Sequence, residues 1–158
     1  MGVVQALRRF IPQPLVAMVV LPAIALLIER AFFDPSPNLS LGAFKWTGAA
    51  LIVAGVAVEA WCGVTFVRFG QTWDHFDTPA RLVTDGPYRI SRHPVYLGGV
   101  LINAGVALLF QSVGLFLYLG LYILILDRLV IPRIEEPVLL RNFGEAYVRY
   151  RRSVRRWL

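Results

Sequence analysis

Four apolar stretches, each close to the length of a membrane-spanning helix, dominate the pattern of hydrophobic and polar positions along the chain. They cover about residues 11–28, 41 or 44 to 67, 94–110 and 113–131. A turn with two prolines at residues 34–38 separates the first two stretches, and only Gln111 and Ser112 separate the last two. The pattern predicts an all-α integral membrane protein of about four transmembrane helices, with the last two forming an antiparallel hairpin.

The first apolar stretch has some features of a signal peptide, because Arg8 and Arg9 precede it. No clean small-x-small cleavage pattern follows, and Glu29 and Arg30 end the apolar run. We therefore expect a retained first helix, with Pro22 as a kink inside it.

Two polar segments carry most of the remaining residues. Residues 68–93 are long for a connection in so small a membrane protein, and such loops are often functional. In residues 132–158, apolar side chains recur at helical spacing with arginines mostly on the opposite face. We expect a single domain of residues 1–158. It comprises two spans in residues 1–67, a structured cytoplasmic loop in 68–93, the hairpin in 94–131 and a C-terminal segment in 132–158. We expect this last segment to form an amphipathic helix at the membrane surface and to cap a bound cofactor.

The charged residues fit a membrane protein better than a nucleic-acid-binding one. Of the 158 residues 57% are hydrophobic, and the net charge is +6. With four spans, Arg30 and Lys45 lie on one side of the membrane and the other fourteen basic residues lie on the opposite side. By the positive-inside rule the termini and the central loop are cytoplasmic, and no nucleic-acid partner is needed to explain the charge.

Candidate chemistry is concentrated in residues 86–98, which read Gly-Pro-Tyr-Arg-Ile-Ser-Arg-His-Pro-Val-Tyr-Leu-Gly. His93 precedes the third helix and Pro94 takes its first position, so the free N–H groups of the first turn could hold an anion. The alternative is that His-Pro merely begins a membrane helix. The hairpin brings this helix start close to Glu135 and Glu136. Those acids could serve a ligand, or could simply be solvated residues that open the C-terminal helix.

The few cysteines and histidines, and the lack of a glycine-rich motif, argue against several kinds of metal and dinucleotide site. Cys62 is the only cysteine, so one chain forms neither a disulfide nor a cysteine-based metal site. His75 and His93 are the only histidines, and their spacing does not predict a metal centre. No glycine-rich dinucleotide fingerprint follows a strand. Glu59 lies within the second apolar stretch, where it faces either the bundle interior or solvent near the membrane surface.

Two motifs resemble the integral-membrane methyltransferases. They are Arg-His-Pro-x-Tyr-x-Gly at residues 92–98 and Glu-Glu-Pro at 135–137, followed by Phe-Gly at 143–144, two tyrosines and a basic tail. This superfamily includes the isoprenylcysteine carboxyl methyltransferases and the phospholipid N-methyltransferases. The resemblance covers about residues 68–158. It implies S-adenosylmethionine as methyl donor, S-adenosylhomocysteine as product, a site at the cytoplasmic face and a lipophilic small molecule or lipid as acceptor.

The resemblance also implies which residues act. By analogy with isoprenylcysteine methyltransferases, the cofactor contacts fall on Ala80, Arg81, Leu82, Val83, Tyr88, His93, Pro94, Val95 and Tyr96. By analogy with phospholipid methyltransferases, Glu135 and Glu136 join them, with Glu135 also a candidate catalytic residue. These types suit the donor, since a helix start and arginines favour its carboxylate, acids favour its ammonium, and tyrosines offer faces to its adenine.

One position departs from the isoprenylcysteine pattern. A substrate-binding arginine should stand four residues before the first acid, but Ile131 occupies that position. Arg128, one helical turn away, and Arg133 are the candidates to replace it in positioning the substrate.

Two other function classes stay open beside the methyltransferase. A reductase of the sterol type, using NADPH, has a similar loop before a late membrane helix, although such proteins are longer. A non-catalytic membrane module that keeps the scaffold is the other. The sequence sets neither the acceptor atom nor the oligomeric state.

Overall fold

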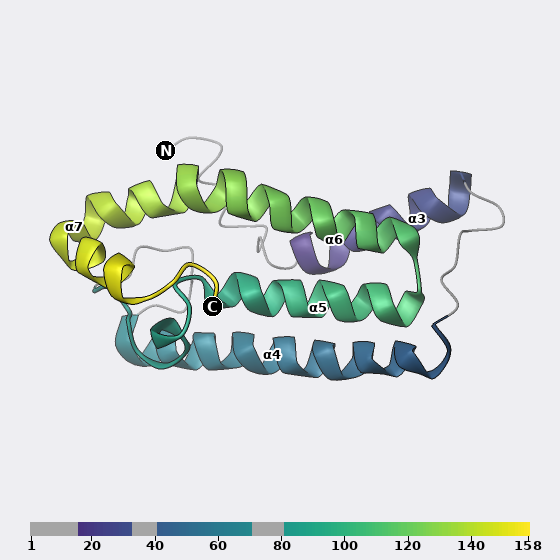
Figure 1. Ribbon diagram of the computed structural model, residues 1–158, viewed down its shortest axis with the longest axis horizontal. Helices are drawn as coiled ribbons and strands as arrows, with labels where there is room; N and C mark the ends of the chain where they lie inside the picture. Colours follow the sequence, from purple (N-terminus) through teal and green to yellow (C-terminus); the bar gives the residue numbers. More distant parts are fainter. Residues whose placement is uncertain (1–15, 33–40, 71–80) are drawn as a thin grey trace.

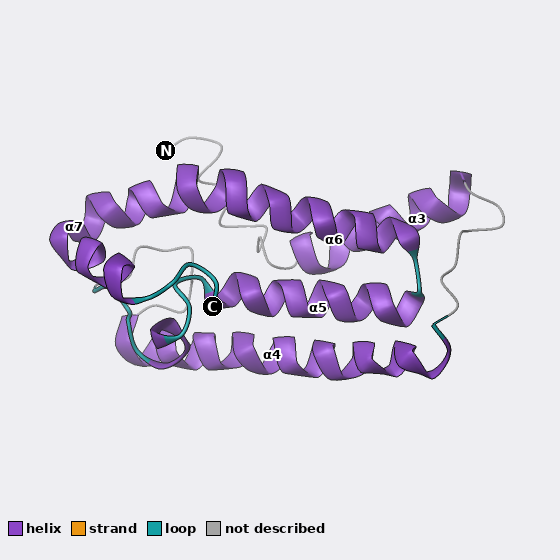
Figure 2. Ribbon diagram, viewed as in Figure 1, coloured by secondary structure: helices purple, strands orange, loops and turns teal. Residues whose placement is uncertain are grey.

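The computed structural model describes residues 16–32, 41–70 and 81–158, and within these ranges it contains helices, turns and loops but no strand (Figures 1 and 2). The longer helices are α3 (Leu21–Phe32), α4 (Thr47–Thr65), α5 (Pro94–Phe110), α6 (Val113–Ile125) and α7 (Glu136–Ser153). The shorter or irregular ones are η1 (Val16–Val20), η2 (Gly42–Trp46), η3 (Phe66–Gly70), η4 (Gly86–Arg89) and η5 (Leu126–Glu135). The predicted all-α class is confirmed for the described residues.

Helices α4 and α5 lie side by side and antiparallel, and glycines set their close approach (Figure 1). Gly55 faces Gly98, and Gly48 faces Gly105, at the same seven-residue interval on both helices. A Cβ atom at Gly55 would lie 2.7 Å from the Gly98 carbonyl oxygen. Small residues at a helix interface allow backbones to pack this closely in an apolar environment. The predicted third helix, residues 94–110, is confirmed at both ends.

The turn between α5 and α6 forms the predicted hairpin and also anchors α3. Gln111 adopts the left-handed conformation, with φ of 53°, and ends α5. The Ser112 hydroxyl accepts a hydrogen bond from the Leu115 N–H at 3.1 Å and so caps α6. The same hydroxyl donates to Glu29, whose carboxylate also accepts from the Gly114 N–H at 3.3 Å.

Helix α3 continues to Phe32, four residues beyond the first predicted span of about residues 11–28. Glu29 is only 4% exposed, and it stays inside the helix because Ser112 and Gly114 satisfy its carboxylate. The beginning of this predicted span, residues 11–15, lies outside the described residues.

The fourth helix also continues beyond its predicted end. The chain stays helical across Pro132 through the π-helical stretch η5 and on into α7. A π-helical stretch changes the local hydrogen-bonding pattern, which accommodates a proline that lacks an N–H. The break comes instead at Gly144, whose φ of 48° and ψ of −125° suit only glycine. From there the chain turns back toward the start of α5 (Figure 1).

Two stretches in the described part of the chain are long and apolar enough to cross a bilayer, Gly42–Phe69 and Val113–Ser153. Helix α5 is apolar but shorter, and α3 has 12 residues. The structure therefore supports two of the four predicted spans by length and composition. In the second stretch the charged residues are concentrated beyond Ile131. Only the part before Ile131 is therefore apolar enough to lie in the hydrocarbon core of a bilayer.

Part of the apolar face of α7 packs against the protein's own core. Tyr147 and Tyr150 are 1% and 8% exposed. They belong to one core cluster with Cys62, Phe66, Val83 and Tyr88. These tyrosines therefore pack against the chain's own loop and α4, and the position of α7 at a membrane surface stays a prediction.

Candidate functional site

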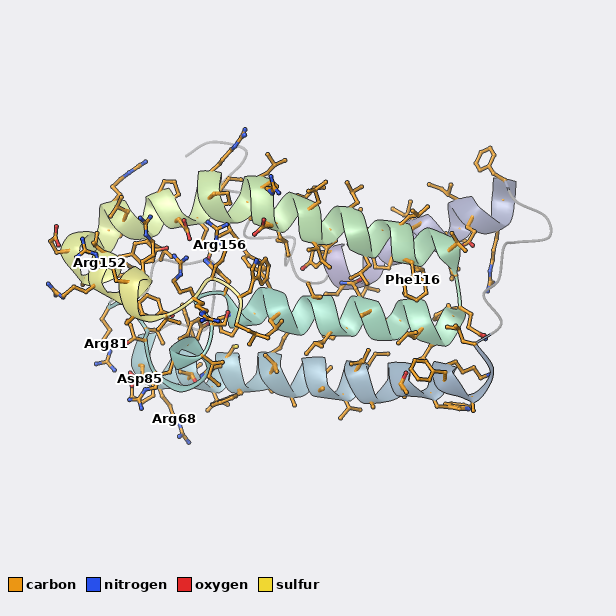
Figure 3. All side chains as sticks on the ribbon, viewed as in Figure 1. Arg68, Arg81, Asp85, Phe116, Arg152 and Arg156 are labelled. Carbon is orange, nitrogen blue, oxygen red and sulfur yellow. The ribbon has the colours of Figure 1, made fainter. Side chains whose placement is uncertain are left out.

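One end of the helical bundle gathers the polar loop, the start of α5, and the C-terminal residues. Figure 3 shows Arg68, Arg81, Asp85, Arg152 and Arg156 at this end, with Phe116 at the other. Hydrogen bonds join the loop to α7, since the Tyr150 hydroxyl donates to the Tyr88 carbonyl at 2.7 Å. The predicted loop and C-terminal segment therefore meet at the same end of the molecule.

The start of α5 has the predicted geometry. His93 is the N-cap residue and Pro94 occupies the first helical turn. The His93 N–H donates to the Ser91 hydroxyl at 3.2 Å, which fixes the loop just before the helix. The imidazole is 1% exposed and stacks on Tyr96, with ring centroids 5.9 Å apart.

His93 lies between the two predicted acids. Its Nδ1 is 3.4 Å from Glu135 Oε1, and its Nε2 is 4.0 Å from Glu136 Oε1. The predicted proximity of the helix start and the acid pair is therefore confirmed. The two acids approach different ring nitrogens, so one buried imidazole has a carboxylate beside each of its nitrogens.

Glu136 is also held by two arginines. Arg92 Nη1 lies 2.7 Å from Glu136 Oε1 and donates to the Tyr147 hydroxyl at 3.2 Å. Arg156 Nη2 lies 3.6 Å from Glu136 Oε2. Each carboxylate oxygen of Glu136 therefore has an arginine beside it.

These contacts shift the pKa values of His93 and Glu136 in opposite directions. Burial alone would lower the pKa of His93, but Glu135 and Glu136 outweigh it and raise the pKa above 6.5. His93 lowers the pKa of Glu136 to about 2, with Arg92 and Arg156 acting in the same direction against the effect of burial. An ionised Glu136 beside a protonated His93 is the arrangement that these shifts favour.

The cluster retains unused hydrogen-bonding capacity. Eight buried side-chain atoms in the described residues have no hydrogen-bond partner, and five of them belong to this cluster: His93 Nδ1, His93 Nε2, Glu135 Oε2, Arg92 Nε and Arg156 Nε. Buried polar atoms are normally paired, so donors and acceptors left over in one cluster fit a polar ligand. Across the ranges that the structure describes, no group of three or more His, Cys, Asp or Glu residues is arranged to hold a metal ion.

The other predicted cofactor contacts are more dispersed. Ala80 lies outside the described residues. Arg81 is exposed and donates to the Phe69 carbonyl at 2.7 Å. Leu82 packs against the core cluster that contains Val83 and Tyr88. Pro94 is buried, while Val95 and Tyr96 line a cavity beside the cluster.

Arg128 is exposed, unlike the residues of the buried cluster. Its side chain is 75% exposed, and its Nε is 3.3 Å from Asp127 Oδ2. Ile131, where the isoprenylcysteine pattern places an arginine, is fully buried. The role of Arg128 in positioning a substrate stays a prediction.

Sequence reasoning did not single out Arg156 or Trp157 within the C-terminal segment. Arg156 and Trp157 both reach Asp127, at 3.3 Å and 3.0 Å. In the sequence Arg156 is one of several arginines in a basic tail, so no local signal separates it from its neighbours. Only the turn at Gly144 brings it to the cluster.

An apolar cavity of about 470 Å³ adjoins the polar cluster. It lies between the η1–α3 segment, α5 and the α6–η5 segment. Its wall includes Met18, Leu21, Tyr96, Tyr118, Tyr122 and Leu126. Tyr96 belongs to both regions, because it lines the cavity and stacks on His93.

Comparison with known proteins identifies the family. The nickel-cobalt-cadmium resistance protein NccN of Alcaligenes xylosoxydans xylosoxydans is 34% identical over 104 residues, which cover 63% of this chain and 46% of that protein. The protein-S-isoprenylcysteine O-methyltransferase of Schizosaccharomyces pombe is 36% identical over 95 residues, which cover 56% of this chain and 39% of that protein. The chain thus spans less than half the length of these curated relatives. No solved structure matches it significantly.

The sequence profile described as phospholipid methyltransferase matches residues 43–146. This range includes α4, α5 and α6, together with both motifs that meet around His93. Because the profile covers well over half of the chain, the protein belongs to the phospholipid methyltransferase family.

Proposed function

We propose that the chain is an S-adenosylmethionine-dependent methyltransferase of the membrane, acting on a lipophilic acceptor as the isoprenylcysteine carboxyl methyltransferases do. The observation that carries the proposal is the position of His93 between Glu135 and Glu136, 3.4 Å and 4.0 Å away. Membership of a methyltransferase family supports the reaction class. The two long apolar stretches support a place in the membrane.

The residues of the cluster fit this donor chemically. When bound, the donor supplies a methyl group on a positively charged sulfonium. Glu135 has a buried, unpartnered oxygen that can accept from an ammonium or a ribose hydroxyl. Tyr96 offers a ring face beside His93. Methyl transfer depends mainly on holding donor and acceptor in line, and such positioning contributes on the order of 7–11 kcal/mol.

The apolar cavity supports a lipophilic acceptor. Its wall is formed by aliphatic side chains and tyrosines from three helical segments, and Tyr96 connects it to His93. An apolar chain in this cavity would bring the end that bears the nucleophile close to the polar cluster. We propose that the acceptor enters from the bilayer and that the site lies at the cytoplasmic face.

Phospholipid N-methylation is the second candidate. The family profile carries that description. Ile131 is fully buried at the position where an arginine would bind the carboxylate of an isoprenylcysteine, and Arg128 is exposed. Neither residue therefore supplies a buried cation for the carboxylate of an acceptor. An amine acceptor does not require such a cation, which favours N-methylation.

Calorimetric titration of the purified chain in detergent with S-adenosylhomocysteine tests the proposal. Binding supports a methyltransferase, whereas a response to NADPH alone supports a reductase, and silence to both supports a non-catalytic module. His93→Asn and Glu135→Gln should each weaken binding about tenfold or more, since each removes a charged partner. Glu145→Gln, at an exposed position on α7, is the matched control. Full affinity in both site variants would place the site elsewhere.

The acceptor is found by a second measurement. A donor with a labelled methyl group, incubated with membranes from producing cells, should transfer the label into the lipid extract. Label that is released by mild base indicates a methyl ester, whereas base-stable label in phospholipid indicates N-methylation. Label found only in soluble molecules would contradict a lipophilic acceptor.

A further inference from the structure

The last residues of the chain close one side of the cluster. Beyond α7 the backbone runs beside the loop that precedes α5. The Arg92 N–H donates to the Arg155 carbonyl at 3.0 Å, and the Ser91 hydroxyl donates to the Arg156 carbonyl at 2.9 Å. The Trp157 indole N–H donates to Asp127 at 3.0 Å. The tail is therefore fixed to the loop on one side and to η5 on the other.

This position brings the Arg156 guanidinium to the acids. Its Nη1 lies 3.3 Å from Asp127 Oδ1, and its Nη2 lies 3.6 Å from Glu136 Oε2. Neither contact is the short, bidentate pair that an arginine can form with a carboxylate. Its Nε is buried and has no hydrogen-bond partner among the described residues. Arg156 thus enters the cluster without using its full donor capacity there.

Arg92 lies beside the other carboxylate oxygen of Glu136, and it too has an unused donor. Its side chain is 9% exposed, and its Nε is also buried without a hydrogen-bond partner in the part of the chain that the structure describes. Two guanidinium groups with unused donors therefore flank Glu136. The unused acceptor is on Glu135, which approaches the other ring nitrogen of His93.

This separation of charge matches an amino acid, which carries a carboxylate and an ammonium on one carbon. We propose that Arg156, together with Arg92, binds the carboxylate of the amino-acid part of the methyl donor, while Glu135 faces its ammonium. The assignment rests on the proposed function. It makes the C-terminal tail a wall of the donor site, and it gives Arg156 a binding role that the neighbouring arginines of the tail do not share.

Two ligands test the assignment on the full chain in detergent. S-adenosylhomocysteine contains the amino-acid part, whereas methylthioadenosine has the same nucleoside and thioether without it. Arg156→Gln should weaken binding of S-adenosylhomocysteine about 10- to 100-fold, the range for losing a hydrogen bond to a charged group. Binding of methylthioadenosine should change less than about twofold. Arg156→Lys should recover part of the loss, because it keeps the charge but not the planar fork.

Arg152→Gln is the matched control, since Arg152 is an exposed arginine of the same tail region and should leave both affinities unchanged. Thermal melting of each variant checks that it is folded. Equal loss for both ligands in Arg156→Gln, or no loss for either, would overturn the assignment while leaving the methyltransferase proposal standing. Wild-type protein that binds neither ligand would overturn both.

Discussion

Glu136 shows how a single carboxylate can bring three chain segments together. Arg92 comes from the loop, Arg156 from the tail and His93 from the start of α5, and all three approach Glu136. Breaking a buried ion pair leaves an uncompensated charge, which costs more than an exposed pair contributes. Glu136 therefore has a structural role beside any role in binding the donor, and its titration should be visible in stability.

The pH dependence of stability follows from the sign of the two pKa shifts. Glu136 has a pKa of about 2 instead of 4.5, so its contribution is present above pH 4.5 and is lost as the pH falls toward 2. The pKa of His93 is raised, so its contribution is present below pH 6.5 and is lost as the pH rises through the raised value. In Glu136→Gln the melting temperature should fall less steeply between pH 4.5 and 2 than in wild type.

Melting curves followed by circular dichroism across this pH range give the comparison. Glu145→Gln, which removes an exposed acid, should keep the wild-type slope. An unchanged acid slope in Glu136→Gln would mean that the folded and unfolded states hold the proton of Glu136 equally.

At the scale of elements, the packing of α4 on α5 depends on glycines that leave no room for a side chain. In Gly55→Ala the new Cβ would lie 2.7 Å from both the Gly98 carbonyl oxygen and Ile102 Cγ1. We expect this substitution to destabilise the protein by about 1–3 kcal/mol, the usual cost of overpacking. Equilibrium unfolding in mixed detergent micelles measures the change.

Gly120→Ala is the matched control within α6. No atom lies within 4 Å of a Cβ built at Gly120, so the alanine meets open space. Its higher helix propensity should leave stability unchanged or raised by up to about 1 kcal/mol. A Gly55→Ala variant as stable as Gly120→Ala would show that the two helices can separate without loss.

The elements also show where prediction from sequence succeeds and where it stops. The limits of α5 were predictable because Pro94 fixes its start and a two-residue turn ends it. The continuation of the helix through Pro132 was not predictable, because proline usually ends a helix. The π-helical stretch around Pro132 explains the exception. The pattern of α7 predicts an amphipathic helix, but periodicity does not say which surface its apolar face packs against. The contact of Arg156 depends on the turn at Gly144, which no spacing rule predicts.

For the whole molecule, the site and the turn between α5 and α6 lie at opposite ends of one bundle, as the positions of Arg152 and Phe116 show (Figure 3). The 28 residues of Gly42–Phe69 extend along this axis. At about 1.5 Å per residue they span roughly 40 Å, which exceeds the hydrocarbon core of a bilayer of about 30 Å. If the bundle crosses the membrane along this axis, its site end and its α5–α6 turn therefore lie on opposite sides of the membrane.

Cysteine labelling decides this orientation. Cys62 is fully buried, so the native thiol gives little background with a membrane-impermeant maleimide. A cysteine at Arg152, at the site end, should react in inverted vesicles but not in intact cells, because we expect that end to be cytoplasmic. A cysteine at Ala43, exposed at the start of η2, should show the opposite pattern. If both positions react from the same side, the Gly42–Phe69 stretch does not cross the membrane. If Arg152→Cys reacts in intact cells, a donor site at the cytoplasmic face is contradicted.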